Sequence, residues 1–310
     1  MNSRNLSRFL SFPEMGKGEN GLLGSEAVIR SKCLHVFAAP SILSVFAPFE
    51  RMDLIRLAKS ASDWTSNELE AYNIVVQELD AQQFFGDSLP EYTGPAGFIQ
   101  FENLPTRGMD AASVALVKRL DLAMTLYEGE ESAVDDFAAE VLRAMGYETD
   151  QTVVRTRKTI RLLMCGERVY AKTDVCVLDI HSGVLLVVQE DKSHLNLTAE
   201  PEPQLIAEGI ATFQHNNLKR EESFLEPLKE ATIPGITMVG TFPTFYKIRV
   251  TEELNYAIRH GLYPPAMTTV YRHTPRVPRR RSDGMKPLDN RKIVLRCYEA
   301  FKRFVPQSQE

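Results

Sequence analysis

The stretch AKTDVCVLDIHSGVLLVVQEDKSH, residues 171–194, decides the fold class of this chain of 310 residues. Residues 173–180 and 184–190 are predicted strands, because both are short runs rich in Val, Leu and Ile. His181, Ser182 and Gly183 between them fit a hairpin loop, with glycine where a positive φ is needed. The stretch therefore predicts an antiparallel hairpin whose second, very apolar strand ends in charged residues.

The sequence on both sides of this hairpin completes an α/β unit. An amphipathic helix over 135–145 and a strand over 152–165 precede it. A helix over 203–217 and an apolar strand over 235–242 follow it. The order helix, three strands, helix, strand predicts a mixed central sheet flanked by helices, with its last two strands parallel and joined by a right-handed crossover. We place this core at residues 131–250.

The flanking regions have a different character. Residues 1–60 show no sustained period, whereas helices are predicted over 66–86, capped by Thr65 or Ser66, and over 110–127. The polar run at 128–131 is the predicted boundary, so residues 1–130 form a mostly helical extension. Residues 251–310 are expected to be a basic segment that packs on the core or extends it.

Composition excludes several classes of protein. The chain is 44% hydrophobic and 25% charged, which is globular composition, and its net charge of −5 excludes a uniformly basic coat protein of nucleic acid. Its four cysteines show no CxxC spacing, so no zinc ribbon is expected. The N-terminus lacks the apolar core of a secretion signal, and the longest uncharged run is too short to span a bilayer. We therefore expect an intracellular protein, nuclear or cytoplasmic, that does not enter a membrane.

Charge is concentrated near the C-terminus. Residues 270–303 hold eleven basic and three acidic residues, a net of +8, so the rest of the chain carries −13 to reach −5. This asymmetry favours contact with a polyanion. The alternatives are an intramolecular clamp on the acidic body and a nuclear-import patch at 276–281. The basic residues are Arg272, Arg276, Arg279, Arg280, Arg281, Lys286, Arg291, Lys292, Arg296, Lys302 and Arg303.

The charged end of the hairpin is the candidate chemical site. Side chains alternate along a strand, so Glu190 and Lys192 share a face. A three-residue loop at 181–183 sets Asp174 opposite Glu190, whereas a two-residue loop turns Asp174 to the other face and leaves Asp179 as its substitute. Two carboxylates on rigid strands suit Mg²⁺, and a lysine beside them can orient a water molecule. The alternative is an ordinary hairpin with solvated charges at its mouth.

The order of these residues resembles the PD-(D/E)XK nuclease superfamily: a helix with Glu140, a strand, Asp174, Glu190-x-Lys192, then a helix opening with Gln204. This resemblance covers about residues 131–245 and implies a restriction-endonuclease-like core. The segments NELEAYN (67–73), AKTDVC (171–176), VVQEDK (187–192) and PEPQLIAEGIATF (201–213) resemble a group of PD-(D/E)XK-like proteins common in mushroom-forming fungi. That narrower resemblance extends upstream to about residue 60.

The resemblance implies a role for each matching position. Asp174 and Glu190 would be ligands of Mg²⁺ or Mn²⁺, and Lys192 would position the attacking water. Glu140 matches an acidic residue that contacts the metal directly or through water, and Gln204 matches a helix residue that helps place ligands or substrate. One turn later this chain has Glu208, where the exonuclease-like branches often have an aromatic residue, so it departs from that subtype.

The expected function is therefore metal-dependent hydrolysis of phosphodiester bonds in nucleic acid, with DNA favoured over RNA. The first alternative is a catalytically inactive nuclease-like fold that binds nucleic acid or protein. A protein-interaction scaffold that works through residues 1–130 is the second. Arg155, Arg157 and Arg161 share a strand face and are candidates for phosphate contacts or for a solvated edge.

Overall fold

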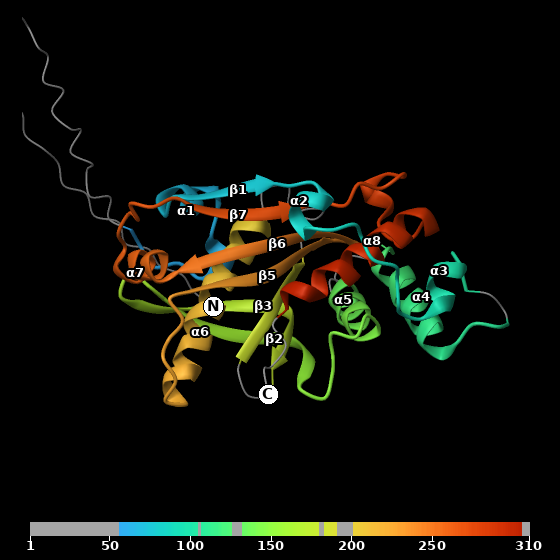
Figure 1. Cartoon of the computed structure of the whole chain (residues 1–310), viewed down its shortest axis with the longest axis horizontal. Coiled ribbons are helices and arrows are strands. Elements are labelled where there is room, and N and C mark those ends of the chain that lie inside the picture. Colours follow the sequence, from blue (N-terminus) through green and yellow to red (C-terminus); the bar gives the residue numbers. More distant parts are fainter. Residues whose placement is uncertain (1–55, 105–106, 126–131, 180–182, 191–200, 306–310) are drawn as a thin grey trace, which may run out of the picture. The chain divides into compact units, whose positions relative to one another are not determined.

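The computed structural model describes residues 56–104, 107–125, 132–179, 183–190 and 201–305, with 189 and 190 described through their backbone only. They belong to one compact unit, Asp53–Glu310. Its centre is a seven-stranded mixed sheet in the order β1-β7-β6-β5-β4-β3-β2, and Figure 1 shows the sheet running from β1 at the top to β2 at the bottom. Helices flank it, so the predicted α/β class is confirmed.

The strands are β1 (Ile74–Glu78), β2 (Thr152–Met164), β3 (Glu167–Asp179), β4 (Gly183–Glu190), β5 (Glu230–Val239), β6 (Phe242–Thr251) and β7 (Thr268–His273). The helices are α1 (Ser66–Ala71), α2 (Ala81–Phe85), α3 (Ala96–Gln100), α4 (Ala111–Ala123), α5 (Ser132–Ala144), α6 (Pro201–Glu222), α7 (Glu252–His260) and α8 (Leu288–Phe301), with short 3-10 turns at Ala61–Asp63, Arg281–Asp283 and Lys302–Phe304. Within the described residues, no helix has an apolar stretch long enough to cross a bilayer.

The predicted central unit is present. After α5, the strands β2, β3 and β4 form an antiparallel meander. Helix α6 then leads to β5, which pairs with β4 in parallel, as the sequence predicts. The positive φ of Gly146, 76°, lies directly after α5, where the sequence places the end of that helix.

The helix predicted over 66–86 is wrong. The segment forms two short helices, α1 and α2, with the strand β1 between them. Asn73 interrupts the helix with a φ of 53°, and the β-branched run that follows pairs in parallel with β7. The apolar residues recur at nearly helical spacing, but the pairing with β7 supplies backbone hydrogen bonds that outweigh this local pattern.

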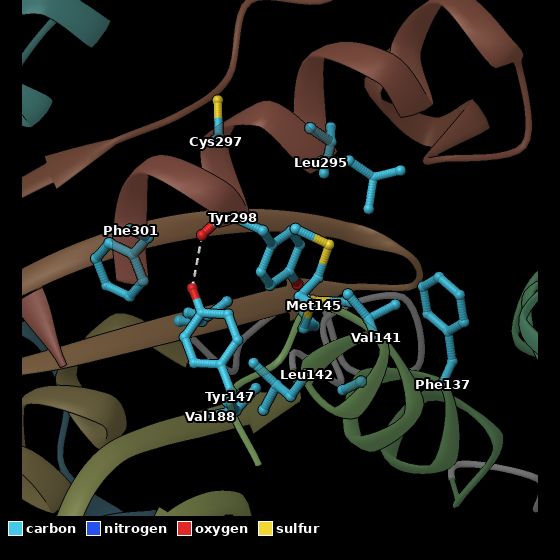
Figure 2. Close-up of a cluster of buried hydrophobic side chains, with 14 of the residues drawn as sticks. Phe137, Val141, Leu142, Met145, Tyr147, Val188, Leu295, Cys297, Tyr298 and Phe301 are labelled. Carbon is cyan, nitrogen blue, oxygen red and sulfur yellow. Dashed lines mark hydrogen bonds between the residues drawn. The ribbon is translucent and has the colours of Figure 1, made fainter. Parts of the chain in front are cut away.

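Two apolar cores lie on the two faces of the sheet. The first is formed with α2, α3, α4, α5 and α8, and the second with α1, α6, α7 and the turn at Ala61–Asp63. Figure 2 shows part of the first core, where side chains of α5 meet those of α8. There the buried Tyr147 hydroxyl donates a hydrogen bond to the Tyr298 carbonyl oxygen at 2.7 Å. The C-terminal helix α8 is therefore part of the main core.

Helix α6 is fixed to the sheet by side-chain amides as well as by apolar packing. The Gln214 side chain accepts a hydrogen bond from the Leu163 backbone N–H at 2.8 Å and donates to the Leu163 carbonyl at 3.1 Å. Asn216 makes the same pair of bonds to Val184, at 2.9 and 2.7 Å. Each amide therefore satisfies both backbone groups of a strand residue, as a neighbouring strand would.

Candidate active site

Asp174 lies in β3 at an irregular point of the β2–β3 ladder. The pairs Thr156↔Val175 and Lys158↔Thr173 flank it, so Arg157 occupies the opposite position in β2. Arg157 has a φ of 55°, in the left-handed region that disfavours residues other than glycine. Strand irregularities of this kind bend a ladder and re-aim side chains, and they are frequent beside active sites.

The register between β3 and β4 differs by one residue from the expected one. Asp179 pairs with Gly183, and the register then shifts between Val177 and Leu178. Beyond this bulge Val175 pairs with Val188, and continuing the ladder by one pair sets Asp174 beside residue 189. The expected position of Asp174 opposite Glu190 is therefore wrong, because the bulge produces the register of the alternative, in which a regular ladder turns Asp174 and Glu190 to opposite faces. The alternative acid, Asp179, is buried beside the loop.

Glu208 of α6 is the most unusual carboxyl group near Asp174. It is fully buried, and its Oε1 accepts a hydrogen bond from the Gln204 amide at 3.2 Å. Among the described residues, no hydrogen-bond partner reaches its Oε2. Burial raises the pKa of Glu208 well above its ordinary value; the hydrogen bond from Gln204 opposes this shift, and the charge of Asp174 adds to it. Glu208 is therefore a neighbour of Asp174 that resists ionisation.

The structure gives the predicted site residues four different placements. The structure brings together Asp174, Gln204 and Glu208, from β3 and one face of α6. The backbone of Glu190 ends β4 and pairs with Met238 of β5. Lys192 lies outside the described residues.

Glu140 is placed elsewhere. It belongs to α5, whose buried residues are all in the first core, whereas those of α6 are in the second. Its Oε2 forms an ion pair with Nη1 of Arg119 in α4 at 3.6 Å. This ion pair between two helices is the contact that the structure gives Glu140.

A polar network holds the start of α6 and was not predicted from the sequence. Arg272 of β7 forms ion pairs with Glu202 of α6 and Glu78 of β1, each at 2.7 Å. Burial, and after it the charge of Glu202, raise the pKa of Tyr246. These partners are up to 194 positions apart in the chain, so no local sequence pattern announces them.

The basic C-terminal segment is largely neutralised within the protein. Six of its eleven cations form ion pairs: Arg272, Arg279, Lys286, Arg296, Lys302 and Arg303. A seventh, Arg291, is fully buried and donates to backbone carbonyls of residues 98, 101, 102, 285 and 286. Arg272, Lys286, Arg296 and Arg303 pair with acids outside the segment, so these four cations act as an intramolecular clamp, whereas Arg279 and Lys302 pair with acids inside it.

The donor atoms near Asp174 are of one chemical kind. The carboxylate and amide oxygens of Asp174, Glu208 and Gln204 are hard ligands, the type that Mg²⁺ and Mn²⁺ prefer. A buried carboxylate oxygen without a hydrogen-bond donor fits a place beside a cation. Among the residues whose side chains the structure describes, which do not include Glu190, no three His, Cys, Asp or Glu side chains are arranged to hold a metal.

Comparison with known proteins adds no identification, because no protein-family model and no curated protein sequence matches the chain.

Proposed function

We propose that this protein is a metal-dependent nuclease with a restriction-endonuclease-like core, and that its active site combines Asp174 with the Glu190-x-Lys192 segment. Support comes from the element order, in which a helix, an antiparallel meander, a second helix and a parallel strand form the centre of the sheet. Asp174 lies in the middle strand of the meander, and the next strand ends at Glu190.

The observation that carries the proposal is the pair formed by Asp174 and the buried carboxyl of Glu208. A fully buried acid with one unpartnered oxygen is costly for folding, by about 1–3 kcal/mol. Such a group beside a second carboxylate has a use where a cation binds, because the cation would stabilise both negative charges. A purely structural helix position would be better filled by an apolar residue.

Each residue would have a defined task. Asp174 and Glu190 would hold Mg²⁺ or Mn²⁺, which requires the irregular backbone at Asp174 and Arg157 to turn the Asp174 carboxylate toward the end of β4. Glu208, whose orientation Gln204 fixes, would lie on the Asp174 side of the ion. The bound ion would neutralise phosphate charge and acidify a water molecule. The Lys192 amine would orient that water and stabilise charge that develops on the phosphate oxygens.

The test is a cleavage assay on plasmid, single-stranded DNA and RNA with Mg²⁺, Mn²⁺ or EDTA. We expect cleavage that requires metal and that falls at least about 100-fold in Asp174→Asn, Glu190→Gln and Lys192→Met. Glu253→Gln, on the exposed side of α7, is the matched control and should cut like the wild type.

Two results would contradict the proposal. Full cleavage by Glu190→Gln and Lys192→Met would place the activity in another site or in a contaminant. Nucleic-acid binding without cleavage in any metal would support the alternative of a nuclease-like binding module.

A further inference from the structure

Strands β2 and β3 carry cations that the protein does not neutralise. They are Arg155, Arg157, Lys158, Arg161, Arg168 and Lys172, and five of the six are exposed while Lys158 is half-buried. Within the described part of the chain, none of these six takes part in an ion pair or a side-chain hydrogen bond. This is the opposite of residues 270–303, where most cations have a carboxylate or carbonyl partner.

Three of these cations share one face of the sheet. The register pairs Thr159 with Lys172, Arg161 with Tyr170, and Leu163 with Arg168. The side chains of these six paired residues, three of which are cations, therefore project to the same side of the sheet. The residues between them, among them Ile160 and Leu162, are buried in the second core on the other side. We call Arg161, Arg168, Tyr170 and Lys172 the basic face.

The charges of the basic face lower the stability of the folded protein. Like charges on neighbouring strands repel, and none of the six residues in these three pairs is acidic. Tyr170 is 49% exposed on the same face. Cations beside an exposed aromatic residue suit a polynucleotide, because its phosphates can pair with the cations and its bases can stack on the ring.

Along strands β2 and β3, the basic face is followed by the residues of the candidate active site. Lys172 precedes Asp174 by two residues in β3, and Arg157 occupies the position opposite Asp174 in β2. Strand β2 is the terminal strand of the sheet, so no further strand lies beyond it among the described elements. Helix α6 with Glu208 packs on the opposite face, so a nucleic-acid strand bound to the basic face would reach the carboxylates by passing around the edge strand β2 near Arg157.

We infer that the basic face binds the phosphate backbone of a polynucleotide and is the substrate-contacting surface of the nuclease. The assignment of the bound polynucleotide as substrate rests on the proposed function, whereas the binding itself does not. The exposed arginines of the C-terminal segment are not needed for it.

The test compares two triple variants that remove the same charge. One combines Arg161→Gln, Arg168→Gln and Lys172→Gln, and the other combines Arg276→Gln, Arg280→Gln and Arg281→Gln. Binding to labelled single-stranded and duplex oligonucleotides is measured by fluorescence anisotropy in EDTA from 50 to 200 mM salt, so that no cleavage intervenes. Thermal unfolding of both variants confirms that they are folded.

The basic-face variant should bind at least about tenfold more weakly at 50 mM salt. Its plot of log affinity against log salt should be less steep by about 2 to 3, because each lost phosphate contact removes about 0.7–0.9. The C-terminal variant should keep the slope of the wild type. Restoring charge with Arg161→Lys and Arg168→Lys in an otherwise native chain should keep the slope as well.

Three results would overturn the inference: an unchanged slope in the basic-face variant, an equal loss in the C-terminal variant, or no binding by the wild type. The result of this binding test does not depend on the result of the cleavage assay. If Asp174→Asn cuts like the wild type but the basic-face variant loses its salt dependence, the catalytic proposal fails and the binding surface stands.

Discussion

At the scale of one residue, the buried Glu208 makes the stability of the protein depend on pH. Its pKa in the folded protein is raised, first by burial and also by Asp174, above the value of about 4.3 in the unfolded chain. The folded protein therefore keeps a proton that the unfolded chain releases. The stability that this proton provides is complete below about pH 4.3 and is lost as the pH rises toward the folded-state pKa.

We therefore expect Glu208→Gln to be more stable than the wild type at pH 8 in EDTA, by about 1–3 kcal/mol. The difference should shrink toward pH 4, where the native side chain is protonated in both states. Urea unfolding followed by circular dichroism from pH 4 to 8 measures it, with Gln204→Ala as a variant of the same helix face. A difference that does not change with pH would show that Glu208 ionises normally.

Arg291 shows that a count of basic residues does not reveal which of them reach solvent. In the sequence it is one of eleven cations in a basic segment. In the structure it is fully buried, its guanidinium lies 4.6 Å from the centre of the Phe98 ring, and five backbone carbonyls surround it. Burial lowers its pKa to about 10. The net charge of a segment predicts a binding surface only where the side chains reach solvent and lack partners.

At the scale of elements, helix α6 depends on its amides as much as on its apolar face. We expect Asn216→Leu to lower the free energy of unfolding by about 1–3 kcal/mol, because it leaves the N–H and C=O of Val184 without their partners. Lys219→Ala, on the exposed end of α6, is the control and should change stability by less than about 0.5 kcal/mol. Equal stability in the two variants would mean that solvent replaces the amide bonds.

Local pattern predicts some of these elements and misses others for a physical reason. Helix α5 and the β3–β4 hairpin follow from periodicity and from glycines at turns, because their stabilising contacts lie near in sequence. Strand β1 forms because β7 pairs with it, and that partner is nearly 200 residues away. The bulge after Val177 is likewise invisible in the sequence, and it changes the neighbour expected for Asp174.

The candidate site was predicted in part. The sequence indicated Asp174 and Gln204, and the structure places Gln204 on the helix that carries Glu208 beside Asp174. The burial of Glu208 could not be predicted, because its neighbours on α6 are both polar and apolar. The placement of Glu140 beside Arg119 depends on how α4 packs against α5, which periodicity does not determine.

At the scale of the whole molecule, the central unit of residues 131–250 does not stand alone. The segment before residue 130 supplies β1, and the segment after residue 250 supplies β7, its neighbour in the sheet. Helix α8 fills the first core with Val294, Leu295, Tyr298 and Phe301, all of them buried. The polar network through Arg272 joins the same distant parts to the start of α6.

We therefore expect residues 131–250 expressed alone to fail to fold, because their first core would face solvent where α8 now packs and Tyr147 would lose the Tyr298 carbonyl. Residues 53–310 should instead unfold in one cooperative transition, since they share one sheet and both cores. Coincident unfolding curves from circular dichroism and from the fluorescence of Trp64 would support this. Two separate transitions, or a folded fragment of residues 131–250, would instead mean that the centre is an independent domain to which the flanking elements were added.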